Sequence, residues 1–219
     1  KFNSDGSPNA IPGSNIPLSA AGGLILWLGW FGFNGGSVLS ADPELTSLTL
    51  VNTSLAAAAG GISSAFMSNL LYKNFDLTMF MNGVLGGLVG ITAGADQMGP
   101  NSAILIGAIA GFILVFGISL LDKLKLDDPV GAIPVHLICG IWGTLAVGLF
   151  GEMASVEQFI NQLIGVGIIG GFSCVSAIII VFIVKATVGL RVSKEEEVKG
   201  LDLSEHYMDA YADFSLSNK

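Results

Sequence analysis

The stretch DDPVGAIPVHLICGIWGTLAVGLF, residues 127–150, decides the fold class. Its apolar part, residues 130–151, is long enough to cross about 30 Å of hydrocarbon, yet it carries His136 in its middle. The helical rise puts this imidazole roughly 12 Å beyond Asp128. An ionisable side chain at that depth costs at least ~2.5 kcal/mol when charged, and it usually lines a polar pathway. His136 is therefore a candidate pore residue, and the alternative is a core histidine bonded to a neighbouring helix.

The composition is that of a polytopic helical membrane protein. Hydrophobic residues make up 52% and charged residues 12% of the 219 positions, and the mean hydropathy is +0.72. These values exclude an ordinary soluble domain. Apolar segments long enough to span a bilayer occupy residues 18–39, 48–72, 77–95, 103–121, 130–151 and 159–184. The sequence therefore predicts an all-α protein with six transmembrane helices.

The basic residues predict the orientation of these spans. All nine fall on one side of a six-span arrangement, whereas the loops on the other side carry acidic residues and no base. Because cytoplasmic loops hold the excess of Lys and Arg, both ends of the chain are expected in the cytoplasm. We divide the chain into a cytoplasmic loop (1–17), a partial transmembrane domain (18–191) and a cytoplasmic tail (192–219). The basic residues are Lys1, Lys73, Lys123, Lys125, Lys185, Arg191, Lys194, Lys199 and Lys219, and the acidic ones opposite are Asp42, Glu44, Asp96, Glu152 and Glu157.

The first residue and the net charge carry two further expectations. Removal of a secretory signal would leave Lys1 outside, against the charge bias, so truncation of a longer protein with further spans upstream is the better explanation. Residues 1–17 are rich in Pro, Gly, Ser and Asn, which is typical of a loop. The net charge of −8 comes largely from the tail and the outer loops, which argues against nucleic acid as a partner.

The spacing of His136 and Cys139 and the repeated glycine pairs both favour a role in helix packing over a role in ligand binding. His136 and Cys139 are three residues apart and could share a metal, but two ligands make a weak site. A buried thiol packs more often as a small hydrophobe, and we expect neither a metal nor a cofactor. Glycines at four-residue spacing allow close helix crossing, and they form the pairs Gly83 and Gly87, Gly86 and Gly90, Gly107 and Gly111, and Gly167 and Gly171.

Aromatic residues crowd the end of the first apolar segment, in LILWLGWFGFNGGS at 24–37. One interpretation is an interfacial belt at the membrane surface. The other is a cation site, because aromatic faces attract ammonium-type cations. Ser37 adds a hydroxyl acceptor one helical turn after Phe33. The aromatic residues are Trp27, Trp30, Phe31 and Phe33.

The sequence GWFGFNGGS at 29–37 and the stretch at 127–150 resemble the two signature regions in the second half of the ammonium transporter (Amt/Rh) family. The resemblance extends through VNTSLAAAAGG at 51–61, NGVLGGLVGITAGAD at 82–96 and the tail at 189–211. It implies an eleven-span fold of two inverted five-helix repeats plus a last helix. It further implies a homotrimer in the plasma (inner) membrane, with one pore in each subunit.

The resemblance also implies roles for individual residues. His136 matches the second of two paired pore histidines, Phe33 one of two stacked phenylalanines that gate the pore from outside, and Trp30 a pore-lining tryptophan. Ser37 matches the serine of an outer ammonium-recruitment site.

The acidic pair Asp127 and Asp128 matches the start of the histidine helix. We expect a structural role in capping, because Asp128 precedes Pro129 in what would be the first turn. Some relatives have an acidic residue in place of Gly131.

The tail matches the family's cytoplasmic tail, which docks beneath the pores and couples to PII-type signal proteins. Its spacing predicts a capping box at Asp202 and Glu205 and an amphipathic helix from Leu203 to Phe214. The alternative is a solvated tail. Many relatives have glycine in place of Tyr207. The expected regulatory residues are Leu203, Ser204, Glu205, His206 and Tyr207.

Together these features predict conduction of ammonium or ammonia through a narrow hydrophobic pore in the lipid bilayer, and no enzymatic activity. The outer site would concentrate ammonium, Phe33 would exclude bulk water, and the neutral histidine pair would bond ammonia or relay a proton. An ammonium sensor on the same fold is the alternative. A scaffold without a solute pathway is disfavoured, because it leaves His136, Phe33 and Ser37 unexplained.

Overall fold

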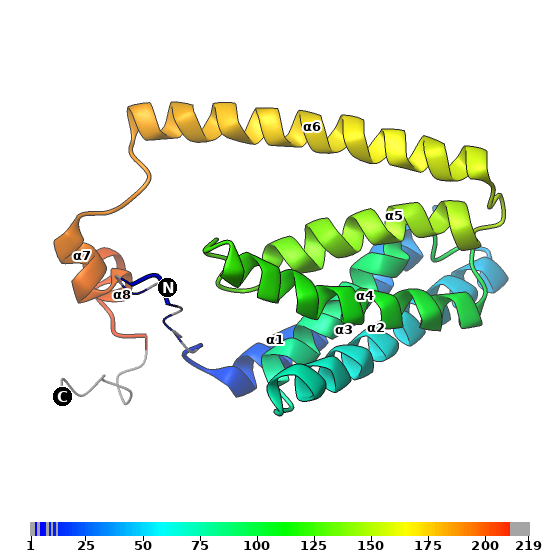
Figure 1. Ribbon diagram of the computed structural model, residues 1–219, viewed down its shortest axis with the longest axis horizontal. Coiled ribbons are helices and arrows are strands. Elements are labelled where there is room, and N and C mark those ends of the chain that lie inside the picture. Colours follow the sequence, from blue (N-terminus) through cyan, green and yellow to red (C-terminus); the bar gives the residue numbers. More distant parts are fainter. Residues whose placement is uncertain (1–2, 4, 8, 10, 12, 211–219) are drawn as a thin grey trace. The chain divides into compact units, whose positions relative to one another are not determined.

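A computed structural model describes residues 3, 5–7, 9, 11 and 13–210. Within these residues every regular element is a helix (Figure 1). The elements are α1 (Ile16–Ser37), α2 (Pro43–Tyr72), α3 (Leu77–Thr92), α4 (Pro100–Lys123), the π-helix η1 (Ile133–Ile138), α5 (Cys139–Phe150), α6 (Val156–Thr187), α7 (Lys194–Lys199) and α8 (Leu201–His206).

The predicted all-α fold with six membrane-spanning segments is confirmed. Five helices are long and apolar enough to cross a membrane by length and composition, with η1 and α5 together forming one of them. The sixth segment is the shorter apolar helix α3. Its 16 residues rise about 24 Å. It stops at Thr92, because residues 93–98 turn back toward α4.

The chain forms two compact units, residues 1–167 and 168–219. In the first unit α2, α3 and α4 pack against one another, and α3 is central because it also contacts α1, η1 and α5. Figure 1 shows α4 and α5 running side by side. Among the described residues α1 and α5 each contact α3 but make no contact with each other.

Side-chain caps determine where the helices begin. Asn15 accepts a hydrogen bond from the backbone N–H of Leu18 at 2.9 Å, and Asp42 accepts one from Leu45 at 2.8 Å. Such caps satisfy backbone donors that have no partner inside the helix. A proline follows in the first turn of α1, α2 and α4, where its missing N–H costs nothing.

Polar side chains of α2 bind it to its neighbours. Each donates to a backbone carbonyl of α3, α4 or the turn between them. In an apolar environment such bonds join helices that lack a hydrophobic driving force for association. The bonds are Ser63 Oγ to Ala108 O (2.6 Å), Ser64 Oγ to Met79 O (3.0 Å), and Asn52 Nδ2 to Ala95 O (2.9 Å) and Met98 O (2.5 Å).

Glycines let α2 approach α3 and α4 closely. A Cβ built on Gly107 would lie 2.6 Å from the Cα of Ala56, and one on Gly87 would lie 3.2 Å from the Cα of Ala57. At both positions the atoms in the way belong to the backbone, so the backbone, not a flexible side chain, would have to move to make room for an added Cβ. The pairs predicted in α3 and α4 therefore lie at helix crossings, whereas Gly167 and Gly171 meet no neighbour in their own units.

The second unit holds the end of α6 followed by α7 and α8. A capping box starts α7, where Ser193 accepts from the N–H of Glu196 and the Glu196 carboxylate accepts from Ser193. The predicted box at Asp202 and Glu205 is wrong, because Asp202 already lies inside α8. Hydrogen bonds from the Ser193 side chain and backbone hold the pKa of Glu196 below its ordinary value.

The predicted tail helix is also shorter than expected. It ends at His206, because Tyr207 adopts a left-handed conformation with φ of 58°. The N–H of Ala210 then turns back to the Asp202 carboxylate at 3.1 Å, and this bond is the main reason for the lowered pKa of Asp202. Tyr211 and Phe214, which completed the predicted amphipathic pattern, lie outside the described residues.

Candidate functional site

The aromatic site predicted in α1 is built from its last two turns. The rings of Trp30 and Phe33 lie 5.4 Å apart at an interplanar angle of 54°. Phe33 is 58% exposed, and its carbonyl accepts the Ser37 hydroxyl at 2.7 Å. Trp30 Nε1 donates to Thr92 Oγ1 at 2.9 Å, which joins α1 to the end of α3. The structure therefore holds the indole in place and leaves the Phe33 ring and the Ser37 oxygen accessible.

His136 lies within the π-helix η1. Its side chain is exposed, and within the part of the chain that the structure describes its imidazole has no hydrogen-bond partner. Both the pore role of His136 and the alternative of a core histidine bonded to a neighbouring helix therefore stay predictions. A π-helical turn is rare and often marks a functional position.

The start of η1 is fixed by Asp128. One carboxylate oxygen accepts from the N–H of Ala132 at 2.9 Å, and the other accepts from Ile133 at 2.8 Å. Pro129 does not lie in the first turn, contrary to what the sequence predicts. The helix begins after Gly131, because the φ of +73° at this glycine is incompatible with a right-handed helix. A residue with a side chain is strained in this conformation, which gives a physical reason for glycine at 131. Asp127 is exposed and makes no hydrogen bond among the described residues.

The helix downstream of His136 is anchored to α4. Cys139 is fully buried with its Sγ 3.6 Å from the Ala110 carbonyl, and Trp142 Nε1 donates to Ile106 O at 3.0 Å. Cys139 thus packs as a small buried side chain while His136 is exposed, so the two do not share a face. No cluster of three or more metal-ligating side chains occurs among the described residues.

The predicted pore residues fall into two groups that the chain does not bring into contact. Trp30, Phe33 and Ser37 belong to α1, whereas His136 belongs to η1, which contacts α3, α4 and α5 but not α1.

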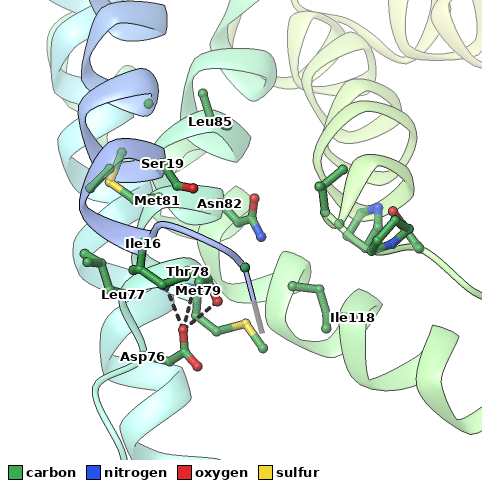
Figure 2. Close-up of a pocket in the computed structure, with 18 of the residues that line it drawn as sticks. Ile16, Ser19, Asp76, Leu77, Thr78, Met79, Met81, Asn82, Leu85 and Ile118 are labelled. Atoms are coloured by element: carbon green, nitrogen blue, oxygen red, sulfur yellow. Dashed lines mark hydrogen bonds between the residues drawn. The ribbon is translucent and has the colours of Figure 1, made fainter. Parts of the chain in front are cut away.

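A large cavity lies at the end of the first unit that carries Lys123 and Lys125. Its volume is about 1000 Å³, and it is lined by the first half of α1, the start of α3, the end of α4 and the segment from Asp128 to Pro134. Figure 2 shows Asn82 of α3 projecting into it. His136 is not among its lining residues.

Asp76 closes one wall of this cavity and caps α3. Its carboxylate accepts from the Thr78 N–H and hydroxyl and from the Met79 N–H, at 2.7, 2.6 and 3.1 Å (Figure 2). Partial burial acts to raise the pKa of Asp76, but these hydrogen bonds outweigh it and leave the pKa below its ordinary value.

A smaller pocket of about 240 Å³ lies at the opposite end of α1 and α3. We call it the outer pocket. Ser37 is the only predicted site residue that lines it. Its other polar walls come from Asn34, Thr49, Thr92, Asp96 and Gln97. Sequence reasoning missed Thr92 and Asn34, whose only signal was a polar side chain inside an apolar segment.

The predicted regulatory residues occupy the second unit. Leu203, Ser204, Glu205 and His206 lie in α8, and Tyr207 ends it. Leu203 and Tyr207 are exposed, at 36% and 85%. An exposed leucine and tyrosine on a short helix are compatible with a docking surface and with a solvated tail.

These helices define a polytopic α-helical membrane protein. The model of the Ammonium Transporter Family matches residues 1–211. The chain belongs to this family, as its signature stretches predicted.

Curated relatives are transporters by name, which agrees with the prediction that the chain is not an enzyme. The ammonium transporter Amt2 of Archaeoglobus fulgidus is 42% identical over 231 residues, which cover 98% of this chain and 49% of that protein. Ammonium transporter 1 member 3 of Solanum lycopersicum is 39% identical, over 96% of this chain and 53% of that protein. The chain therefore spans about half the length of the curated relatives it matches.

Solved structures give the same result for the fold. A Sensor Amt Protein superposes with a TM-score of 0.88 at 36% identity, over 94% of this chain and 53% of that chain. Mep2 of Candida albicans superposes with a TM-score of 0.81 at 24% identity, over 89% of this chain and 47% of that one. The second likeness is one of fold alone.

Proposed function

We propose that this chain forms part of a channel that conducts ammonium or ammonia across a membrane. The family match over residues 1–211 is the observation that carries the proposal. Conduction would need the remaining half of the pore wall, because the chain spans only about half of its relatives.

The proposed path begins at the end of α1. Ammonium would be drawn to the exposed Phe33 ring and the Ser37 oxygen, since aromatic faces and hydroxyl oxygens both stabilise cations. Trp30, fixed by Thr92, would form the pore wall beside Phe33. An ammonium ion is costly in a narrow apolar passage. His136, paired with a second histidine as the family resemblance implies, would bond ammonia or relay a proton there.

Orientation and assembly belong to the same proposal. The side of the membrane that carries all nine basic residues would be the cytoplasm, so the tail at 192–219 would lie there. We further propose the plasma membrane as the location, a trimer with one pore in each subunit, and a PII-type protein as a partner of the tail.

An ammonium sensor is the second candidate. It is favoured by the 36% identity and TM-score of 0.88 with a Sensor Amt Protein. A sensor would bind ammonium at the same residues and signal through its tail, without requiring net transport.

The test is ammonium flux through the complete protein that contains this chain, reconstituted in liposomes. We expect an ammonium-evoked current or internal pH change, and we expect His136→Ala to alter its size or selectivity while the trimer remains intact by size-exclusion chromatography. Normal assembly with unchanged flux in His136→Ala would contradict the proposed role of the histidine. Saturable ammonium binding without any flux in the wild type would favour the sensor.

A further inference from the structure

The turn of η1 that carries His136 is one residue wider than an α-helical turn. The backbone N–H of Cys139 donates to the carbonyl of Pro134, five residues earlier, and a bond of this span defines a π-helix. At the start of η1 the chain still has the α-helical span, since the N–H of Val135 donates to the Gly131 carbonyl at 3.0 Å. The extra residue is therefore confined to the segment between Pro134 and Cys139, and His136 lies inside it.

The residues at the two ends of this wide turn are both buried against α4. Pro134 is fully buried, and a Cβ built on Gly117 of α4 would lie 3.2 Å from the Cβ of Pro134. Cys139 is also fully buried, with its Sγ 3.6 Å from the Ala110 carbonyl of the same helix. Because Gly117 has no side chain, it leaves room for the Pro134 ring close to the α4 backbone.

The extra residue lets Pro134 and Cys139 face α4 together. Five residues of a regular α-helix turn through roughly 500°, which would leave these two side chains about 140° apart around the helix axis. In a π-turn, residues five apart are joined by a hydrogen bond and lie about one turn apart on the same side. His136, two residues after Pro134, is then left on the side away from α4, where its side chain is exposed.

A regular α-helix through the same residues would turn the imidazole. Burial of Cys139 and the bond from Trp142 Nε1 to the Ile106 carbonyl hold the later part of the helix on α4. The residues before Cys139 would therefore rotate, and Pro134 would leave its contact with Gly117. His136 would then lie about 60° from Cys139 and share its face. Burial of the Pro134 ring opposes this rotation, because the rotation would return apolar surface to the surroundings of the helix.

We propose that Pro134, packed on Gly117, is a positioning residue that holds the His136 imidazole away from α4 and toward the solute path. Asp128 and Gly131 set where η1 begins, and the contact between Pro134 and Gly117 sets the direction of the histidine. Proline suits this position, because a residue in the first turn of a helix has no helical partner for its N–H. The inference rests on the proposed function, since it concerns the proposed pore histidine.

The first experiment determines the structure of Pro134→Ala by electron cryomicroscopy, in the complete protein that contains this chain. Alanine removes most of the contact with Gly117 and favours a regular α-helix. We expect the N–H of Cys139 to bond to the Val135 carbonyl, four residues earlier, and the imidazole to turn toward the Cys139 face. A π-turn and an imidazole direction unchanged from the wild type would overturn the proposal.

Flux in liposomes gives a second measurement, which a purely structural role of Pro134 would not change. Pro134→Ala should change the ratio of methylammonium to ammonium flux about five-fold, equivalent to about 1 kcal/mol, in the same direction as His136→Ala. Pro43→Ala is the matched control, because Pro43 also lies in the first turn of a helix but is exposed. An equal change of the flux ratio in Pro134→Ala and Pro43→Ala would overturn the positioning role.

Gly117→Ala tests the same contact from α4, and it decides the question if Pro134→Ala does not fold. The added Cβ would lie 3.2 Å from the Pro134 Cβ and 2.8 Å from the Ile138 Cδ1, so it would push Pro134 off α4. We expect the same change of the flux ratio, and an unchanged ratio in an intact Gly117→Ala trimer would overturn the proposal. If the imidazole turns in Pro134→Ala but the wild type conducts nothing, the positioning role stands and the transport proposal fails.

Discussion

The Trp30 indole and the Thr92 hydroxyl form a one-directional link at 2.9 Å. Thr92 gives its own proton to the Leu88 carbonyl, so its oxygen can accept from Trp30 but cannot donate in return. The bond holds the α1 aromatic pair against the end of α3. Thr92 therefore has two roles: its Oγ1 atom fixes the predicted pore tryptophan, and the residue lines the outer pocket.

Thr92→Val should loosen this link without changing side-chain volume. The Trp30 N–H would lose its partner in an apolar setting, and an unsatisfied buried donor costs about 1–3 kcal/mol. We expect a lower midpoint of thermal unfolding and a changed Trp30 fluorescence signal. Thr144→Val is the control, because the Thr144 hydroxyl bonds only to Gly140 of its own helix region. Similar losses in both variants would mean that the link to Trp30 adds no stability.

Gly107→Ala should force α2 and α4 apart. The added Cβ would lie 2.6 Å from the Cα of Ala56, so backbone must move. Overpacking of this kind costs about 1–3 kcal/mol. Gly165→Ala is the matched control, since no atom lies within 4 Å of its added Cβ. The midpoint of thermal unfolding in detergent should fall for Gly107→Ala only, and an equal fall for Gly165→Ala would point to glycine flexibility instead of close packing.

The six spans were predictable because apolar length is a strong, local signal. Segment ends were predicted less well where tertiary bonds decide them. Asn52 of α2 holds the carbonyls of Ala95 and Met98, and α3 therefore stops at Thr92 although the sequence stays apolar to Ala95. A hydropathy profile cannot predict such a bond, because the bond joins residues that are far apart in the sequence.

The candidate site was predictable only as a set of residue types. The sequence identified His136 and Phe33, but periodicity assumed an α-helix and so placed His136 and Cys139 on one face. The π-turn, set by Asp128 and Gly131, leaves one exposed and the other buried. In the tail, Ser193 and Glu196 have the spacing of a capping box, and the structure forms the box there instead of at Asp202 and Glu205.

Asp128→Ala should destabilise the start of the histidine helix. The carboxylate accepts from two backbone N–H groups, and loss of such a cap costs about 0.5–2 kcal/mol. Asp127→Ala is the control within the same acidic pair, because the Asp127 side chain makes no hydrogen bond among the described residues. Hydrogen exchange of the Ala132 and Ile133 amides should accelerate in Asp128→Ala alone. Equal acceleration in Asp127→Ala would show that the pair acts by charge and not by capping.

The start of α3 should depend on pH through Asp76. Its pKa is lower in the folded protein than the ordinary value of 3.8, because Thr78 and Met79 donate to the carboxylate. A group with a depressed folded pKa contributes stability above its unfolded pKa and loses it as pH falls through the folded one. Unfolding of the wild type should therefore become easier below about pH 4. Asp76→Asn should be less stable at pH 7 and show less of this acid dependence, measured as the midpoint of thermal unfolding between pH 3 and pH 7. An acid dependence that is the same in both proteins would assign the effect to other carboxylates.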